Sequence, residues 1–515
     1  MERKRITDRD IEDYLSQLED GYLSEDGNEE DENDFEQILT TAELRAVLED
    51  NEQSEPVADV QDPSLIEDPP LIEDPALIDD PVPGISNNTT SSSQPIRDNI
   101  DVQRLIWKKQ SLIFQEDNIR FQGCNDFPAS IMTLETPFQF FSYYFTPDFI
   151  SNITEESNRY SVQKQPDRPD CVTDVEIRKY MGILIFMSVY HYPNVRSYWH
   201  TKFGFRPISE AMPVNRFEKI RRIIHFNNND MHKPINDPNH DKLHKLRPVI
   251  DHLNEKFSSI PLDQRLSIDE QMCATKIRHF MKQYLPLKPH KWGFKLFMLC
   301  SLMGYAYKFI IYSGKDNEPM LENETDVGTV GNVVIKLSRA IPRTMNHIVY
   351  FDNFYTSLPL MYYLAKQGIW CLGTVQRNRL GKSCKLPTKQ QVMAKSVERG
   401  SYEEYVTSYN GIEMSSVSWK DNRQVTLLST YVGAEPVSTI ERYDKVEKRK
   451  KFIQCPKVVK EYNAHMGGVD LMDSYLGRYR IRMKRCKLLS SIKCEKCKVF
   501  LCSKKNSDCF NKFHI

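Results

Sequence analysis

The sequence predicts an α/β protein in which a helical region precedes a mixed sheet. Residues 101–261 repeat apolar side chains at helical spacing, whereas strand-like runs dominate from residue 262 onward. Five cysteines gather near the C-terminal end. At 515 residues the chain is long enough for several domains. We therefore expect a disordered acidic tail, a helical domain, a sheet-based core with a β-rich insertion, and a small zinc-binding tail.

Residues 1–100 form the expected tail. They hold 29 acidic and 6 basic side chains, with many Ser and Pro and few aromatics, a composition typical of disorder. A hexapeptide repeat (DPSLIE, DPPLIE, DPALID) begins at Asp62, and its regular prolines exclude a continuous helix. The rest of the chain carries 63 Lys+Arg against 42 Asp+Glu, which favours a polyanionic partner. The tail either solubilises the protein or competes for that basic surface.

Residues 101–261 are expected to form a helical domain for dimerisation or DNA binding. Amphipathic runs such as EIRKYMGILIFMSVYHY have the 3.6-residue period. In PVNRFEKIRRIIHF, four basic residues lie beside an apolar face. They are Arg216, Lys219, Arg221 and Arg222. Either the helix only packs into the core, or some of these basic residues also contact phosphates. The most apolar stretch, 296–307, is too short to cross a bilayer, and MERKRITDRD is no secretory signal, so we expect an intracellular protein without membrane contact.

The core begins at residue 262. Its first part, 262–369, contains strand-like runs such as RLSIDEQM and NHIVYFDNFYTS, then the helix SLPLMYYLAKQG. Residues 370–440 alternate short strands and turns, and we interpret them as a β-rich insertion. The second part, 441–482, returns to helix at VVKEYNAHMGGVDLMDSYLGRYRI.

Four aspartates in the core are candidate catalytic residues. Asp269 is expected to end a strand, Asp352 follows an apolar run, and Asp470 and Asp473 are spaced to share one helix face. Each alone is more often a cap or turn residue. Brought together, such carboxylates hold two divalent cations, the usual apparatus for cutting and joining phosphodiesters.

Residues 483–515 contain a pattern typical of a zinc site. CEKC supplies two thiols at CxxC spacing, and further thiols and an imidazole follow at short intervals. So short a segment cannot fold by hydrophobic burial alone, which favours zinc over free surface thiols. The candidate ligands are Cys486, Cys494, Cys497, Cys502, Cys509 and His514. The other seven cysteines are scattered singly, as reduced thiols are.

The ordered strings SIDEQM, KPHKWGFKLFMLC, FDNFYTSLPL and YNAHMGGVDLMDSY resemble the piggyBac transposase family over residues 130–482. The resemblance implies an RNase H-like catalytic core of DDE/D type. Its metal triad would be Asp269, Asp352 and Asp470, with Asp473 close by, and Mg²⁺ or Mn²⁺ as cofactor. It further implies double-stranded DNA partners, transposition at TTAA sites through hairpin ends, a homodimer and a nuclear location. The basic run KVEKRKKF is a candidate import signal.

The chain departs from the family twice. Only Cys486 stands where the family's Cys-rich domain opens with a CxxC pair, and RYRIRMKRCKLLSS replaces a long helical segment expected before that domain. The resemblance then implies a weakened dimer and leaves three readings. They are a transposase, a catalytically inactive transposon-derived protein that binds DNA or chromatin, and a decayed element product.

Two basic groups remain ambiguous in the sequence. Lys288, Lys291 and Lys295 surround Trp292, and such a mixture suits either phosphate and base contacts or a charged strand edge. The pair Arg377 and Arg379 carries the same ambiguity.

Overall fold

The computed structural model describes residues 100–113, 115–124, 126–275, 279–285, 291–314, 319–444 and 448–481, and the strand backbone of 491–493, 500–504 and 507–508. The acidic tail with its repeat lies outside the described residues. So do Lys288 and five candidate zinc ligands, namely Cys486, Cys494, Cys497, Cys509 and His514. Cys502 falls within β13. Disorder and zinc binding therefore stay predictions.

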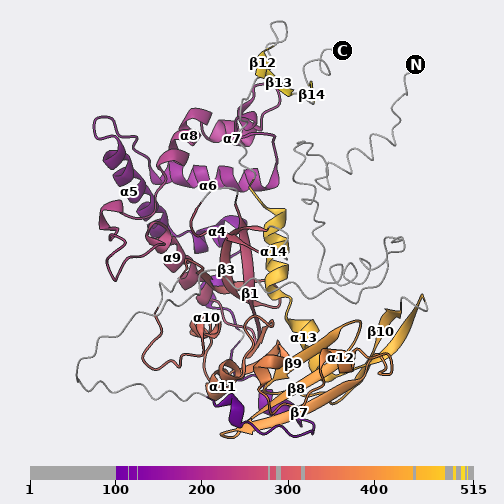
Figure 1. Cartoon of the computed structure of the whole chain (residues 1–515). Coiled ribbons are helices and arrows are strands. Elements are labelled where there is room, and N and C mark those ends of the chain that lie inside the picture. The colour runs from indigo at the N-terminus through magenta and orange to yellow at the C-terminus, as the bar shows by residue number, and fades with distance from the viewer. Residues whose placement is uncertain are drawn as a thin grey trace, which may run out of the picture.

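A single large sheet confirms the expected α/β class (Figure 1). Its strands run in the order β2-β3-β1-β5-β6-β9-β8-β7, with β4 also paired to β3. Strand β5 is parallel to β1 and to β6, whereas β3 is antiparallel to β1. The strands are β1 Arg265–Ala274, β2 Gln283–Tyr284, β3 Trp292–Ser301, β4 Ala306–Ile311, β5 Ile348–Phe351, β6 Trp370–Thr374, β7 Tyr402–Tyr409, β8 Ile412–Lys420 and β9 Gln424–Ser429.

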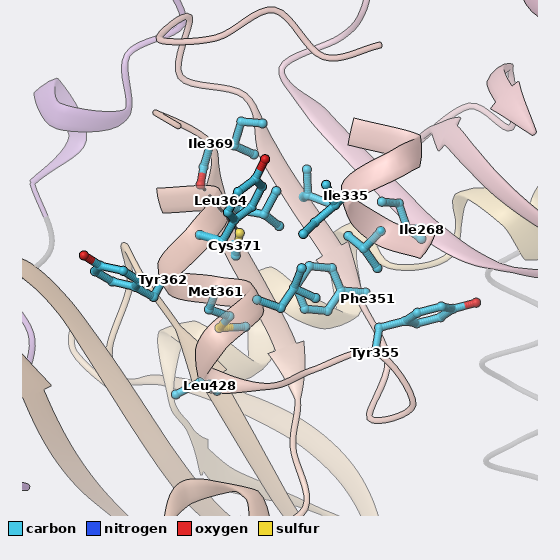
Figure 2. Packing of buried hydrophobic residues seen from close by; sticks show 14 of the residues in the cluster. Ile268, Ile335, Phe351, Tyr355, Met361, Tyr362, Leu364, Ile369, Cys371 and Leu428 are labelled. Carbon is cyan, nitrogen blue, oxygen red and sulfur yellow. Dashed lines mark hydrogen bonds between the residues drawn. The ribbon is translucent and has the colours of Figure 1, made fainter. Parts of the chain in front are cut away.

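One face of the sheet is covered by α10 (Thr329–Ser338) and α11 (Leu358–Lys366). Their apolar side chains pack with Ile268 of β1 and Phe351 of β5 in the largest buried cluster (Figure 2). Proline at its first turn and the Ser357 cap start α11 directly after the turn that follows β5. This packing holds β1 and β5 together under one helical layer.

The opposite face carries α14 (Gly468–Arg478), preceded by α13 (Lys457–His465) (Figure 1). Val469 and Met472 of α14 pack with Met298 and Cys300 of β3. Helix α9 (Arg247–Ser258) contributes to the same cluster. It is also hydrogen-bonded to β4, because the Asn254 side-chain amide donates to the Phe309 carbonyl oxygen (3.0 Å) and accepts from the Phe309 N–H (2.9 Å).

Four of the described helices before the sheet build a second core of their own, namely α5 Pro147–Lys164, α6 Asp174–Val189, α7 Arg206–Ala211 and α8 Val214–Ile223. The shorter α3 Ala129–Met132 and α4 Pro137–Tyr144 instead place Ile131 and Tyr143 against the largest cluster. Two basic residues of α8 are engaged within this region. Arg216 donates to both oxygens of Glu176 (2.6 and 2.8 Å), and Lys219 donates to Asp170 (2.8 Å). Both charges are therefore paired within the helical region.

Residues 370–440 do not build a sheet of their own. Strands β7, β8 and β9 extend the central sheet beyond β6, to which β9 pairs. A separate hairpin follows, β10 (Ser438–Asp444) and β11 (Arg449–Cys455), which includes part of the basic run. There Lys450 pairs with Glu441 and Lys451 with Asp444, at 3.3 and 3.6 Å.

The remaining elements are short. They are α12 Lys389–Val392, β12 Ser491–Lys493, β13 Phe500–Lys504 and β14 Ser507–Asp508, with 3₁₀ turns at Val102–Arg104, Glu116–Ile119, Val195–Trp199, Asn229–Met231, His244–Leu246 and Arg377–Leu380. Among the described residues, no helix combines the length and the apolar character that a membrane span requires.

Candidate functional site

The parallel pairing of β1 with β5 places two of the four candidate aspartates side by side. Ile268 lies opposite Phe351, so Asp269 and Asp352 are the next residues on adjacent strands. Neighbouring strands run about 4.8 Å apart. Asp352 is the first residue after β5, as expected, whereas Asp269 does not end its strand, because antiparallel pairing with β3 carries β1 on to Ala274.

Helix α14 lies against the sheet face that carries Asp269. Asp269 is opposite Met298 in the register of β1 and β3, so the two side chains share a face. Met298 packs with Val469 and Met472 of α14. Gly468 makes this approach possible, because a Cβ there would collide with the Ser301 carbonyl oxygen and the Ser267 hydroxyl.

The third and fourth aspartates, Asp470 and Asp473, lie three residues apart on α14. Asp470 is exposed, whereas Asp269, Asp352 and Asp473 are half-buried. Burial raises the pKa of the Cys300 thiol, and the Asp473 and Asp269 charges raise this pKa further. Both carboxylates therefore act on one sulfur between β3 and α14.

The charges of Asp269, Asp352 and Asp470 also affect a second buried group, the phenol of Tyr462 in α13. Burial is the main cause that raises the pKa of its phenol, and the charges of Asp352, Asp269 and Asp470 add to the effect. Charges from β1, from the turn after β5 and from α14 thus all act on this one phenol.

The chemistry of this group suits a hard divalent cation, which prefers anionic oxygen ligands. Within the described part of the chain, however, no three His, Cys, Asp or Glu side chains stand close enough together to form a metal site. The aspartates share a neighbourhood without forming a finished ligand set. Cation binding would require their side chains to draw together, and Mg²⁺ or Mn²⁺ stays a prediction.

The turn after β5 is held by a residue whose role the sequence left open. Nη1 of Arg379 donates to the carbonyl oxygens of Asn353 (2.6 Å), Phe354 (3.1 Å) and Thr356 (3.0 Å). Asp352 itself accepts from the Phe354 amide (2.9 Å). Arg379 therefore positions the Asp352 turn, a role that its place in the sequence does not reveal. Its neighbour Arg377 instead donates to the Leu386 carbonyl at 2.8 Å.

Arg379→Ala should loosen this turn. A hydrogen bond from a charged donor contributes about 1.5–3 kcal/mol, so losing three contacts by one group should expose the turn amides locally. We expect faster hydrogen exchange at residues 353–356. Arg377→Ala is the matched control and should leave that exchange unchanged. Equal exchange in wild type and both variants would show that Arg379 does not hold the turn.

Two further residues, Lys295 and Glu270, make contacts beside the turn. Lys295 is only 9% exposed, so it is no charge on a strand surface. Its Nζ lies 4.4 Å from the ring centre of Phe354 and 4.9 Å from that of Phe297. On the same sheet face as Lys295, Glu270 accepts a 2.9 Å hydrogen bond from Tyr355. The sequence pointed to neither of these contacts.

Comparison with known proteins gives consistent matches. Residues 136–499 match a protein-family model described as transposase IS4. PiggyBac transposable element-derived protein 3 of Homo sapiens is 30% identical over 392 residues, which are 75% of this chain and 63% of that protein. PiggyBac transposable element-derived protein 2 of Homo sapiens is 30% identical over 363 residues, or 69% and 58% of the two chains. The chain thus spans about three fifths of the length of these relatives.

A solved structure has a similar fold. It is a piggyBac transposase synaptic complex with hairpin DNA, and it superimposes with a TM-score of 0.55 at 22% identity, covering 69% of this chain and 71% of that one.

Proposed function

The chain belongs to the piggyBac-type transposase IS4 family, and from this membership we propose that it cuts and joins DNA strands as a transposase or a domesticated derivative of one. The observation that supports this most is the register that makes Asp269 and Asp352 neighbours, with α14, which carries Asp470, packed on the sheet face of Asp269. Three anionic oxygen donors from three separate elements are what phosphodiester chemistry with divalent cations requires.

The residues would divide the work by position. Asp269, between the other two elements, would bridge both cations. Asp352 would hold one and Asp470 the other, while Asp473 would support Asp470 from the next turn of α14. When bound, a cation pair activates the attacking oxygen and stabilises the leaving oxygen of an in-line displacement. Arg379 would keep Asp352 at the edge of the sheet while DNA binds.

Finer features belong to the same proposal. The strand order β4-β3-β1-β5-β6, with β3 antiparallel to its neighbours, supports an RNase H-like core. Double-stranded transposon ends, hairpin intermediates and TTAA targets are the proposed DNA substrates, in a homodimer located in the nucleus. The similar solved structure is a complex with hairpin DNA, which is in line with these substrates.

A catalytically inactive protein that binds DNA or chromatin is the second candidate. Two observations favour it. The described residues hold no assembled metal-ligand set, and RYRIRMKRCKLLSS replaces a long helical segment that the resemblance to the family implies. Both candidates require DNA binding, and they differ in strand cleavage.

Plasmid nicking by the purified full chain separates the candidates. We expect conversion of supercoiled to nicked DNA in Mg²⁺ or Mn²⁺ and none in EDTA, because the aspartates act through bound cations. DNA retention on a gel without nicking under any condition would favour the inactive derivative. If the protein neither bound nor nicked DNA, both candidates would be wrong.

A further inference from the structure

Exposed aromatic side chains gather on the hairpin that extends from β2 to β3. Tyr284 and Trp292 lie opposite each other in the register, with ring centres 4.7 Å apart. They are 48% and 53% exposed, and Phe280 nearby is 69% exposed. Cross-strand ring pairs stabilise hairpins, but that role does not require half of each ring to remain in contact with water.

Positive charge accompanies these rings. Nζ of Lys282 lies 5.0 Å from the centre of the Trp292 ring, and Lys291 is exposed immediately before it. Cations beside exposed flat rings are the combination that binds single-stranded nucleic acid, because the rings stack on bases and the cations meet phosphates.

The hairpin also stands on the same side of the sheet as the candidate site. Trp292 and Met298 are six residues apart on β3 and therefore share a face, the face of Asp269. Strand β2 pairs with β3 at Gly293 and Trp292, and Gly293 is opposite Ala274 of β1. Trp292 is therefore six positions along the sheet from Asp269, a distance of about 20 Å.

We propose that Tyr284 and Trp292, with Lys282, form a stacking site for unpaired DNA bases next to the cleavage site. This inference rests on the proposed function, because the site would receive nucleotides flanking the phosphate held at Asp269. An extended single strand has unstacked bases free to meet the rings, whereas a duplex keeps its bases within the helix. The structure therefore assigns this hairpin a preference for single-stranded over double-stranded DNA.

Tryptophan fluorescence tests the proposal, because Trp292 is the only exposed one of the chain's five tryptophans, all of which lie in the described part of the chain. The full chain is titrated with a 15-nucleotide oligo(dT) and, separately, with a mixed-sequence 15-base-pair duplex at one salt concentration. We expect oligo(dT) to quench the fluorescence. Trp292→Leu should abolish the quenching and weaken oligo(dT) binding by about 10- to 100-fold, measured by anisotropy, with duplex binding changed by less than about 2-fold.

Two variants serve as controls. Trp292→Phe keeps a flat ring and should retain most of the oligo(dT) affinity. Phe452→Leu removes a 76% exposed ring from β11 and should change neither affinity. Oligo(dT) binding that survives Trp292→Leu, or a wild-type protein that binds duplex but not oligo(dT), would overturn the stacking site and leave the proposed function standing. Binding of neither DNA would overturn the proposed function itself.

Discussion

Asp269→Asn should abolish metal-dependent DNA cleavage while DNA binding and folding persist. Asp269 is beside Asp352, which directly follows the neighbouring strand, and it lies on the sheet face that α14 covers. Its carboxylate is therefore placed to share cations with Asp352 and with the aspartates of α14. Asparagine keeps the shape but loses the charge that a divalent cation requires. Removing a supporting residue of a metal site costs about 10–100-fold, and a direct ligand should cost more than about 100-fold. Initial nicking rates in Mg²⁺ measure the loss.

Glu270→Gln is the matched control for this variant. Glu270 is the next residue of β1 but points to the opposite face, where it accepts from Tyr355. We expect cleavage by this variant to stay within about 3-fold of wild type, because its hydrogen bond survives as a neutral one. Wild-type nicking by Asp269→Asn would refute the assignment of metal ligands. Equal losses in both variants would point to general damage to β1.

Gly468→Val should destabilise the scaffold at the contact between α14 and the sheet. Any Cβ at this position collides with the Ser267 hydroxyl and with the Ser301 carbonyl oxygen, which is part of the backbone and cannot rotate away. Relief requires α14 to move off the sheet, which opens the contacts of Val469 and Met472. Overpacking of this kind costs about 1–3 kcal/mol, measured as the free energy of unfolding in urea. Cleavage should fall as well, because Asp470 and Asp473 move with the helix.

Gly182→Ala provides the control for the backbone effect. Gly182 is a helical glycine of α6, and a Cβ added to it would have no atom within 4 Å. Alanine there should stabilise the protein by about 0.5–1 kcal/mol, because glycine is the poorer helix former. If Gly468→Val unfolded at the same urea concentration as wild type, the close approach of α14 to the sheet would be wrong.

Several features of the core followed from local sequence patterns. The 3.6-residue period marked the helices before the sheet, and the runs RLSIDEQM and NHIVYFDNFYTS marked β1 and β5. The extent of β1 beyond Asp269 was not visible in its own sequence, because the pairing partner, β3, supplies the register. The pairing of the strands within 370–440 was likewise not visible in their own sequence, because they join the central sheet through β6 and β9.

Roles of individual basic residues were the least predictable part. Arg379 and Lys295 looked alike in the sequence, as cations beside strands. The first binds three carbonyl oxygens of the Asp352 turn and the second is buried against Phe354. A long, flexible side chain finds its partner among segments far away in the chain, so composition around it carries little information.

By itself, the sequence determined the α/β class, the family and the four aspartates as candidates, because residue type and short-range periodicity are local properties. Only the tertiary structure decided that β1, the turn after β5 and α14 come together at Asp269. That meeting depends on a parallel register between distant strands and on a helix that approaches the sheet where Gly468 has no side chain. Both are packing relations between residues far apart in the chain, which no local pattern specifies.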